Sequence, residues 1–247
     1  MGLFFPEDRH NAPESDYGFA GYRLLLEDNW NHYLKCGLIL TLSLIPFFLA
    51  IVFSLLSQSL LVALLGGGIT GILVGPAFYG LYDCILTSLR HQHTNWRTRY
   101  FQVLKKNWKS SLLPSGILYG FISIFIFIIM IFWWKNSLPN LADSIVLLIS
   151  FGIVFGINLI YWPQLVLFQQ TNVTRIKNCL LFYLKYPLRC LLALGIQALY
   201  WGILALLLPW SVVIVPLTIW FPVFLSTFVL YPSLNSAFQI DTLFEST

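Results

Sequence analysis

The chain has 247 residues, of which 58% are hydrophobic and 10% are charged. Because a soluble domain carries about 25% charged residues, this composition excludes an ordinary water-soluble protein and indicates an integral membrane protein. The formal net charge is +4, and the basic residues follow the topology rule for membrane loops, so no nucleic-acid partner is expected.

Six apolar runs are long enough to cross a bilayer, whose hydrocarbon core takes about 20 helical residues. Short polar or proline-containing breaks at 57–59, 135–140 and 208–211 separate several of them. We therefore predict an all-α fold, a polytopic membrane bundle of about six transmembrane helices. The break at 208–211 is the weakest, so a re-entrant hairpin is an alternative to two full spans there. The predicted spans are 36–57, 60–88, 112–134, 144–168, 189–208 and 211–231.

The part of the chain before the first span, residues 1–35, is predicted as a cytoplasmic arm that ends in an amphipathic helix over 16–34. One face of this helix is apolar and largely aromatic, which is typical of a helix that lies in the membrane interface. The six-helix domain then covers 36–231, and 232–247 forms a short cytoplasmic tail. The apolar face consists of Phe19, Tyr22, Leu26, Trp30 and Tyr33.

The segment "LLGGGITGILVGPAFYGLYDC" at 64–84 carries many glycines inside an apolar run. Every fourth residue of the predicted helix is small up to its last third, and small residues let two membrane helices approach closely. The spacing predicts a packing ridge that serves as an interface with another helix or with a partner protein. Pro76 predicts a kink that splays the end of this helix from its neighbour. The ridge consists of Ala63, Gly67, Gly71, Gly75, Pro76 and Tyr79.

Asp83 is the one acid well inside a predicted span, since Asp143 lies at a span edge. An acid at the centre of a span costs about 2.5–3.5 kcal/mol on insertion scales, so it is expected to have a partner. We predict an ion pair with Arg90 or with a basic residue of 175–189. Contact with a ligand or partner, and coupling to a proton or ion, are the alternatives.

Among the few other polar residues inside the spans, Asn158, Gln164 and Gln197 stand out, along with Thr41 and Ser43. Side chains of this kind usually form hydrogen bonds between membrane helices, worth about 0.6 kcal/mol each. Together with Asp83, the asparagine and the two glutamines form a candidate intramembrane polar site, which a carrier would need as a path for its solute.

Basic residues concentrate in the loops 89–111 and 169–189 and in the N-terminal arm. Because cytoplasmic loops are rich in Lys and Arg, both termini are predicted on the cytoplasmic side. Segments 99–113 and 181–192 have amphipathic spacing and are predicted as helices in the interface plane. The basic residues are expected to contact anionic lipid headgroups or a cytoplasmic partner. These residues are Arg97, Arg99, Lys105, Lys106, Lys109, Arg175, Lys177, Lys185 and Arg189.

The sequence contains no pattern typical of an active site. It has no G-x-S-x-G, H-E-x-x-H or Walker motif, and no C-x-x-C pair among its four cysteines. His91 and His93 lie in a basic loop without a nearby acid or cysteine. We therefore predict a protein that is not an enzyme and that has neither a metal site nor a cofactor.

Two long segments resemble the YesL family. "ILVGPAFYGLYDCILTSLR" with "WRTRYFQVLKKNWKSSLLPSGIL" is similar to the family's Gly-Pro span, basic loop and following helix, and "YWPQLVLFQQTNVTRIKNCLLFYLKYPLRCLLAL" is similar to its second half. The resemblance covers about residues 17–235. It implies a bacterial membrane protein associated with a carbohydrate ABC importer, and it supplies no active site. The matching positions are Gly75, Pro76, Phe101, Lys105, Asn107, Pro163, Lys177 and Asn178.

These observations favour a non-catalytic membrane subunit or accessory protein of a carbohydrate ABC importer in the bacterial cell membrane. Its partners would be anionic lipid headgroups and either the ABC permease subunits or a second copy of the chain. A small stand-alone carrier for a polar solute is the alternative, although its interior is sparsely polar and a sugar needs several hydrogen-bonding groups. A membrane sensor or an assembly factor is a lesser alternative.

Overall fold

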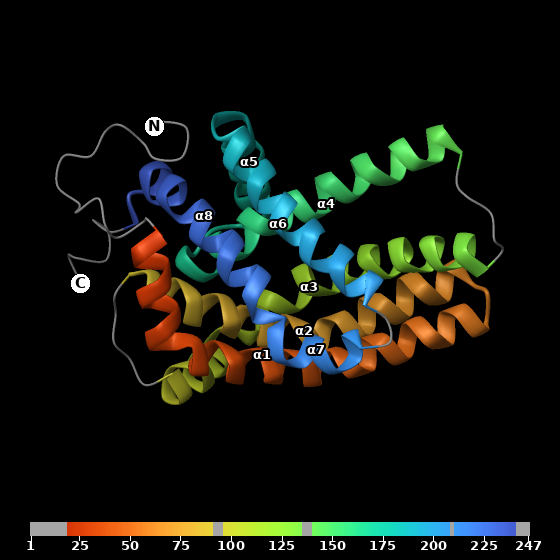
Figure 1. Ribbon diagram of the computed structural model, residues 1–247, viewed down its shortest axis with the longest axis horizontal. Helices are drawn as coiled ribbons and strands as arrows, with labels where there is room; N and C mark the ends of the chain where they lie inside the picture. Colours follow the sequence, from red (N-terminus) through yellow and green to blue (C-terminus); the bar gives the residue numbers. More distant parts are fainter. Residues whose placement is uncertain (1–18, 91–95, 135–139, 208–209, 241–247) are drawn as a thin grey trace.

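The computed structural model describes residues 19–90, 96–134, 140–207 and 210–240, and within these ranges the chain is helical with no strand (Figure 1). Six of the helices (α1, α2, α3, α4, α6 and α8) are long and apolar enough to cross a membrane. This confirms the predicted all-α bundle of six spans and makes the chain a multi-pass integral membrane protein. The helices are α1 Phe19–Leu56, α2 Leu60–Leu89, α3 Trp96–Trp134, α4 Leu141–Leu167, α5 Asn172–Lys185, α6 Pro187–Leu206, α7 Ser211–Thr218 and α8 Trp220–Phe238.

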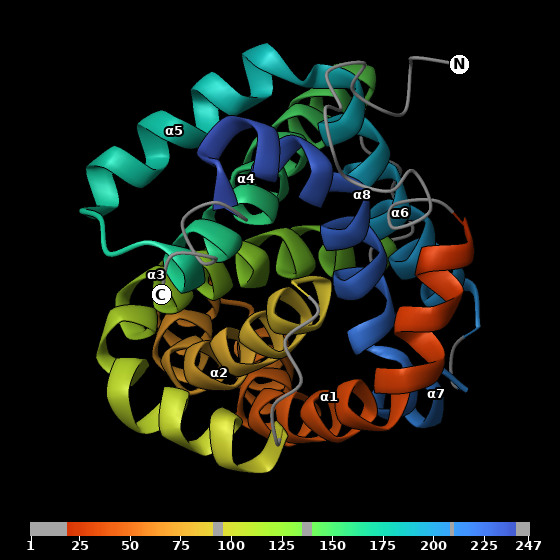
Figure 2. The same ribbon diagram turned by 90° about the vertical axis from the view of Figure 1, so that its left-hand side faces the viewer.

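The spans form two layers. Helices α1, α2 and α3 run side by side, with α2 packed against both neighbours, and we call them the first layer (Figures 1 and 2). Helices α4, α6 and α8 cross above them at an angle and form the second layer, in which α6 packs along α8. Helix α1 begins and α8 ends at the same end of the bundle, as six spans require (Figure 1).

Local signals explain where several helices begin and end. Gln58 has a φ of 49°, which turns the chain between α1 and α2. The side chain of Ser59 then caps α2 by accepting a hydrogen bond from the Val62 amide, 3.4 Å away. Thr171 caps α5 in the same way, and Pro187 occupies the first turn of α6, where its missing N–H costs no hydrogen bond.

The predicted interfacial helix over 16–34 is part of α1, which continues into the first span and bends between the two parts (Figure 1). Part of its aromatic face packs against α8, whereas Trp30 is exposed. The ring of Tyr33 lies 4.9 Å from that of Phe224 on α8, and Tyr22 packs against both Phe224 and Phe228. Residues 1–18 and the side chain of Phe19 lie outside the described part of the chain.

The last span was predicted at 211–231 and is found at Trp220–Phe238, so residues 232–238 belong to α8 and not to a tail. The helix is interrupted at Ile219, between α7 and α8, because Pro222 has no N–H to donate to the carbonyl of Thr218. Hydropathy does not locate this break, since both sides of it are apolar. The alternative of a re-entrant hairpin is not supported, because α6 and α8 are both long enough to span. Residues 241–247 lie outside the described part.

Candidate functional site

The predicted glycine ridge on α2 is buried against α3 of the same chain. A Cβ atom placed on Gly67 would overlap Ser123, and one placed on Gly71 would overlap Tyr119. The two helices are also joined by hydrogen bonds: Ser123 Oγ donates to the Ala63 carbonyl at 2.6 Å, and Ser115 Oγ donates to the Gly71 carbonyl at 2.6 Å. The ridge is therefore a packing surface, as predicted, with α3 as its partner.

This arrangement corrects the prediction that the ridge binds a partner protein, because α3 covers it completely along its glycines. The sequence itself carries a signal for this pairing. Small or hydroxyl residues recur on α3 at the same spacing of four as on α2, and the antiparallel register places Ala63 opposite Ser123 and Gly71 opposite Ser115. The residues on α3 are Ser111, Ser115, Tyr119 and Ser123.

The predicted splaying of α2 after Pro76 is also wrong. Helix α2 continues through Pro76 to Leu89, and its last turns stay against α3. The ring of Tyr100 fills the space beside Gly80, and its hydroxyl donates to the Ala77 carbonyl at 3.4 Å. These contacts hold the end of α2 in place beyond the proline.

Asp83 forms the predicted ion pair, but with Arg99 and not with Arg90. Arg99 donates from Nε to Oδ2 at 2.7 Å and from Nη2 to Oδ1 at 3.2 Å, a two-point contact. The Asp83 side chain is 8% exposed and that of Arg99 is 30% exposed. Hydrogen bonding to the carboxylate raises the pKa of the Arg99 guanidinium. Arg90 instead donates from Nε to the Leu86 carbonyl of its own helix.

The other three polar residues of the candidate site make hydrogen bonds to different partners and not to one another. Asn158 donates to the Val154 carbonyl at 2.7 Å and accepts from Trp162 at 3.2 Å, so both bonds stay within α4. Gln164 lies against the Cys179 sulfur at 3.5 Å and so connects α4 to α5.

Gln197 connects α6 to α8, because its amide nitrogen donates to the Pro222 carbonyl and to Ser226 Oγ, each at 3.1 Å. Asp83 pairs with α3, Gln164 faces α5, and Gln197 faces α8. The four residues therefore form no common polar path among the described residues, which removes the main support for a carrier of polar solutes.

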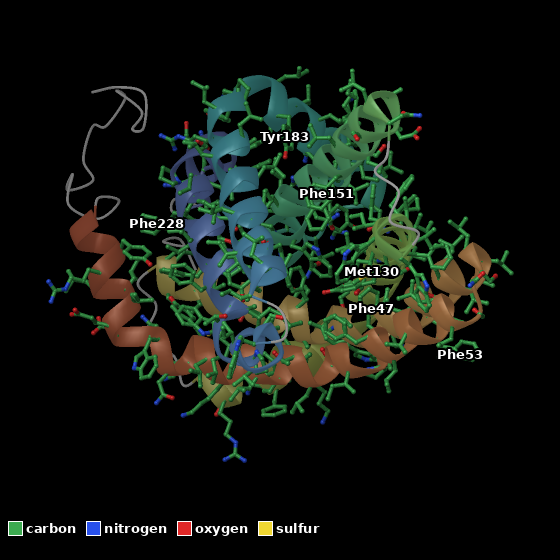
Figure 3. All side chains as sticks on the ribbon, turned by 45° about the vertical axis from the view of Figure 1, so that its right-hand side comes forward. Phe47, Phe53, Met130, Phe151, Tyr183 and Phe228 are labelled. Atoms are coloured by element: carbon green, nitrogen blue, oxygen red, sulfur yellow. The ribbon has the colours of Figure 1, made fainter. Side chains whose placement is uncertain are left out.

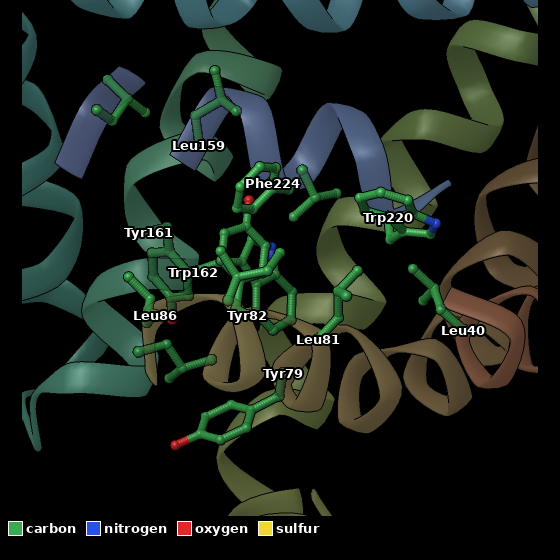
Figure 4. Packing of buried hydrophobic residues seen from close by; sticks show 14 of the residues in the cluster. Leu40, Tyr79, Leu81, Tyr82, Leu86, Leu159, Tyr161, Trp162, Trp220 and Phe224 are labelled. Carbon is green, nitrogen blue, oxygen red and sulfur yellow. The ribbon is translucent and has the colours of Figure 1, made fainter. Parts of the chain in front are cut away.

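A cavity of about 280 Å³ lies between the two layers. Its walls come from five spans and from the start of α8, and they are almost entirely apolar (Figure 3). Of the four candidate polar residues, only Asn158 and Gln197 line it. Aromatic rings form much of the wall: Trp162 lies 4.9 Å from Phe78 and stacks on Tyr82 at 6.3 Å between ring centroids (Figure 4).

The basic residues predicted at the cytoplasmic surface differ in their exposure to solvent. Lys105, Lys109, Lys177 and Lys185 are exposed, as contact with lipid headgroups requires. Arg97 is exposed and Arg189 is half-buried. Arg99 is engaged with Asp83. The side chain of Lys106 lies outside the described part of the structure.

Arg175 is buried, contrary to the prediction that it lies at the surface. Its guanidinium donates to Asn172 Oδ1 at 2.8 Å and to the Phe168 carbonyl at 3.2 Å. It also lies over the ring of Tyr161, 6.0 Å from the centroid. Arg175 thus fixes the connection between α4 and α5 instead of contacting lipid headgroups or a partner.

The described ranges contain no group of three His, Cys, Asp or Glu side chains that could hold a metal ion. Comparisons with protein-family models, with curated proteins and with solved structures give no match. The candidate site therefore depends on geometry alone, and the resemblance to the YesL family stays a prediction.

Proposed function

We propose that this protein is a non-catalytic membrane subunit that assembles with the permease of a carbohydrate ABC importer in the bacterial cell membrane, with both termini in the cytoplasm. The class of partner comes from the resemblance to the YesL family, and the orientation comes from the basic loops. The observation that carries the proposal is the exposed first half of α4.

The fully buried residues of helix α4 lie between Gly156 and Leu165. Its first half is apolar and rises away from α3 (Figure 1), and Leu141 and Leu148 are 80% and 75% exposed. A Cβ atom on Gly152 would have no atom within 4 Å. Membrane helices associate by close packing at small residues, so this half of α4 offers a second membrane protein a surface that its own chain leaves uncovered.

The geometry favours a subunit over a carrier of polar solutes. A polar solute needs several hydrogen-bonding groups along its path. The cavity contains two of the four candidate residues, and Asn158 and Gln197 already bond within the chain. The exposed lysines support contact with anionic headgroups on the cytoplasmic face.

The test is recovery of tagged protein from its own membranes in mild detergent, followed by mass spectrometry. Permease and ATPase subunits should be recovered in a fixed ratio. Gly152→Leu should abolish this recovery, because the added side chain blocks close approach at α4. Gly202→Leu is the matched control, since Gly202 lies on α6 and is equally open.

Recovery of the protein alone, as a monomer or a homo-oligomer, would contradict the subunit role. Loss of partners with Gly202→Leu but not with Gly152→Leu would retain the subunit role and move its interface from α4 to α6.

A further inference from the structure

We propose that the cavity between the two layers is a binding site for an acyl chain of a membrane phospholipid. The cavity lies between α1, α2 and α3 on one side and α4, α6 and the start of α8 on the other. This inference does not depend on the identity of any protein partner.

The two side-chain amides that line the cavity make hydrogen bonds inside the protein. Asn158 uses its amide nitrogen on Val154 and its oxygen on Trp162. The amide nitrogen of Gln197 bonds to α8 at two positions. Because the remaining wall is aliphatic and aromatic, the cavity offers little to a polar solute, and apolar cavities of this kind exclude water. An apolar occupant fits this wall.

The size of the cavity suits a part of one lipid chain. An apolar protein cavity of roughly 150 Å³ holds a benzene molecule, and this cavity is larger, about 280 Å³. It therefore has space for several methylene groups of an acyl chain.

The cavity is open to the side of the bundle, where the bilayer lies. Phe48 and Ile129 line it and are 46% and 57% exposed. Phe47 on α1 and Phe151 on α4 lie on opposite sides of the space between the layers (Figure 3). Since acyl chains are the most abundant apolar groups around a membrane protein, a chain can enter laterally and stay between the layers.

The experiment uses the full chain in nanodiscs of phosphatidylethanolamine and phosphatidylglycerol that contain a phospholipid with a photoreactive diazirine in its acyl chain. After irradiation, labelled residues are mapped by mass spectrometry. The expected result is labelling of Leu118 and Leu159, which line the cavity and are buried, in addition to outer residues such as Leu199. Labels confined to outer residues would overturn the proposal.

Two matched variants sharpen this result. Ile122→Trp fills the cavity from a partly buried wall position, whereas Ile203→Trp adds the same ring on the outer face of α6. We expect Ile122→Trp to lose the labels at Leu118 and Leu159 and Ile203→Trp to keep them. Equal labelling in the two variants would overturn the proposal. If Ile122→Trp does not fold, the wild-type map decides.

Native mass spectrometry of the delipidated protein identifies the occupant. A retained phospholipid in the wild type and in Ile203→Trp, but not in Ile122→Trp, supports the proposal. Retention of detergent alone, or of an apolar compound that is not a lipid, overturns it.

Discussion

The glycines of the two layers differ in their surroundings, although both sets lie inside membrane helices. On α2, a methyl group at Gly67, Gly71 or Gly75 would overlap atoms of α3. In the second layer, a methyl group at Gly152, Gly195 or Gly202 would meet no atom within 4 Å, whereas one at Gly156 would overlap Tyr183 of α5. A glycine therefore marks a packed interface only where a facing helix lies close against it, and most glycines of the second layer have no such neighbour.

The first layer is also joined by polar contacts between its helices. Ser115 and Ser123 donate to backbone carbonyls of α2, and Asp83 pairs with Arg99 at the end of the same interface. In the second layer, Gln197 makes the corresponding contact between α6 and α8. We therefore expect the first layer to be the more stable part, and the following predictions test that difference from the largest effect to the smallest.

Gly71→Leu should have the largest effect. The added side chain has no space beside Tyr119, so the two helices must separate or the fold must rearrange, at a cost of at least about 3 kcal/mol. Unfolding in detergent, followed by circular dichroism, measures the loss. Gly195→Leu is the control and should stay within about 0.5 kcal/mol of the wild type. Equal losses in both variants would contradict the difference between the layers.

Arg99→Met should be the next most damaging change. It leaves the buried Asp83 carboxylate without its counter-ion, and because Arg99 is 30% exposed we expect about 2 kcal/mol, below the usual cost of breaking a fully buried pair. The exposed pair Arg23–Glu27 provides the control, and Arg23→Met should lower stability far less than Arg99→Met, because solvent screens an exposed ion pair. Asp83→Asn combined with Arg99→Met should cost less than the sum of the single changes. Strict additivity would show that the pair is not coupled.

Ser115→Ala should cost about 0.6–1 kcal/mol, the usual worth of one hydrogen bond between membrane helices. It removes the bond to the Gly71 carbonyl and leaves the packing unchanged. Ser43→Ala, which removes a bond within α1 only, should cost less. The same unfolding assay compares the two, and a larger loss for Ser43→Ala would contradict the assignment.

Gly195→Ala should have the smallest effect and the opposite sign. Its surroundings are open, and alanine lowers the conformational entropy of the unfolded chain. We therefore expect the free energy of unfolding to rise by about 0.4–1 kcal/mol. Gly71→Ala should instead destabilise, because its Cβ overlaps Tyr119. A gain in both variants would show that α3 can move away from α2 at little cost.

The comparison also shows how far the sequence predicts the candidate site. The spacing of Gly67, Gly71 and Gly75 predicts a packing ridge, because small residues every fourth position form one face of any helix. The spacing does not identify the facing helix. The structure shows that α3 of the same chain, and not a partner protein, packs on the ridge. The sequence predicted that Asp83 forms an ion pair with a basic residue, but it did not identify Arg99 as the partner. Arg99 lies 16 residues away, beyond the neighbours that helical spacing brings together.

The sequence by itself determined the number of spans, the helical fold class and the ridge, because hydropathy and residue spacing are local properties of the chain. Only the tertiary structure decided that α3 covers the ridge, that Arg99 neutralises Asp83 and that Arg175 is buried. It also decided that five spans and the start of α8 enclose an apolar cavity. These features depend on which helices cross and at what angle, and that follows from packing between residues far apart in the chain.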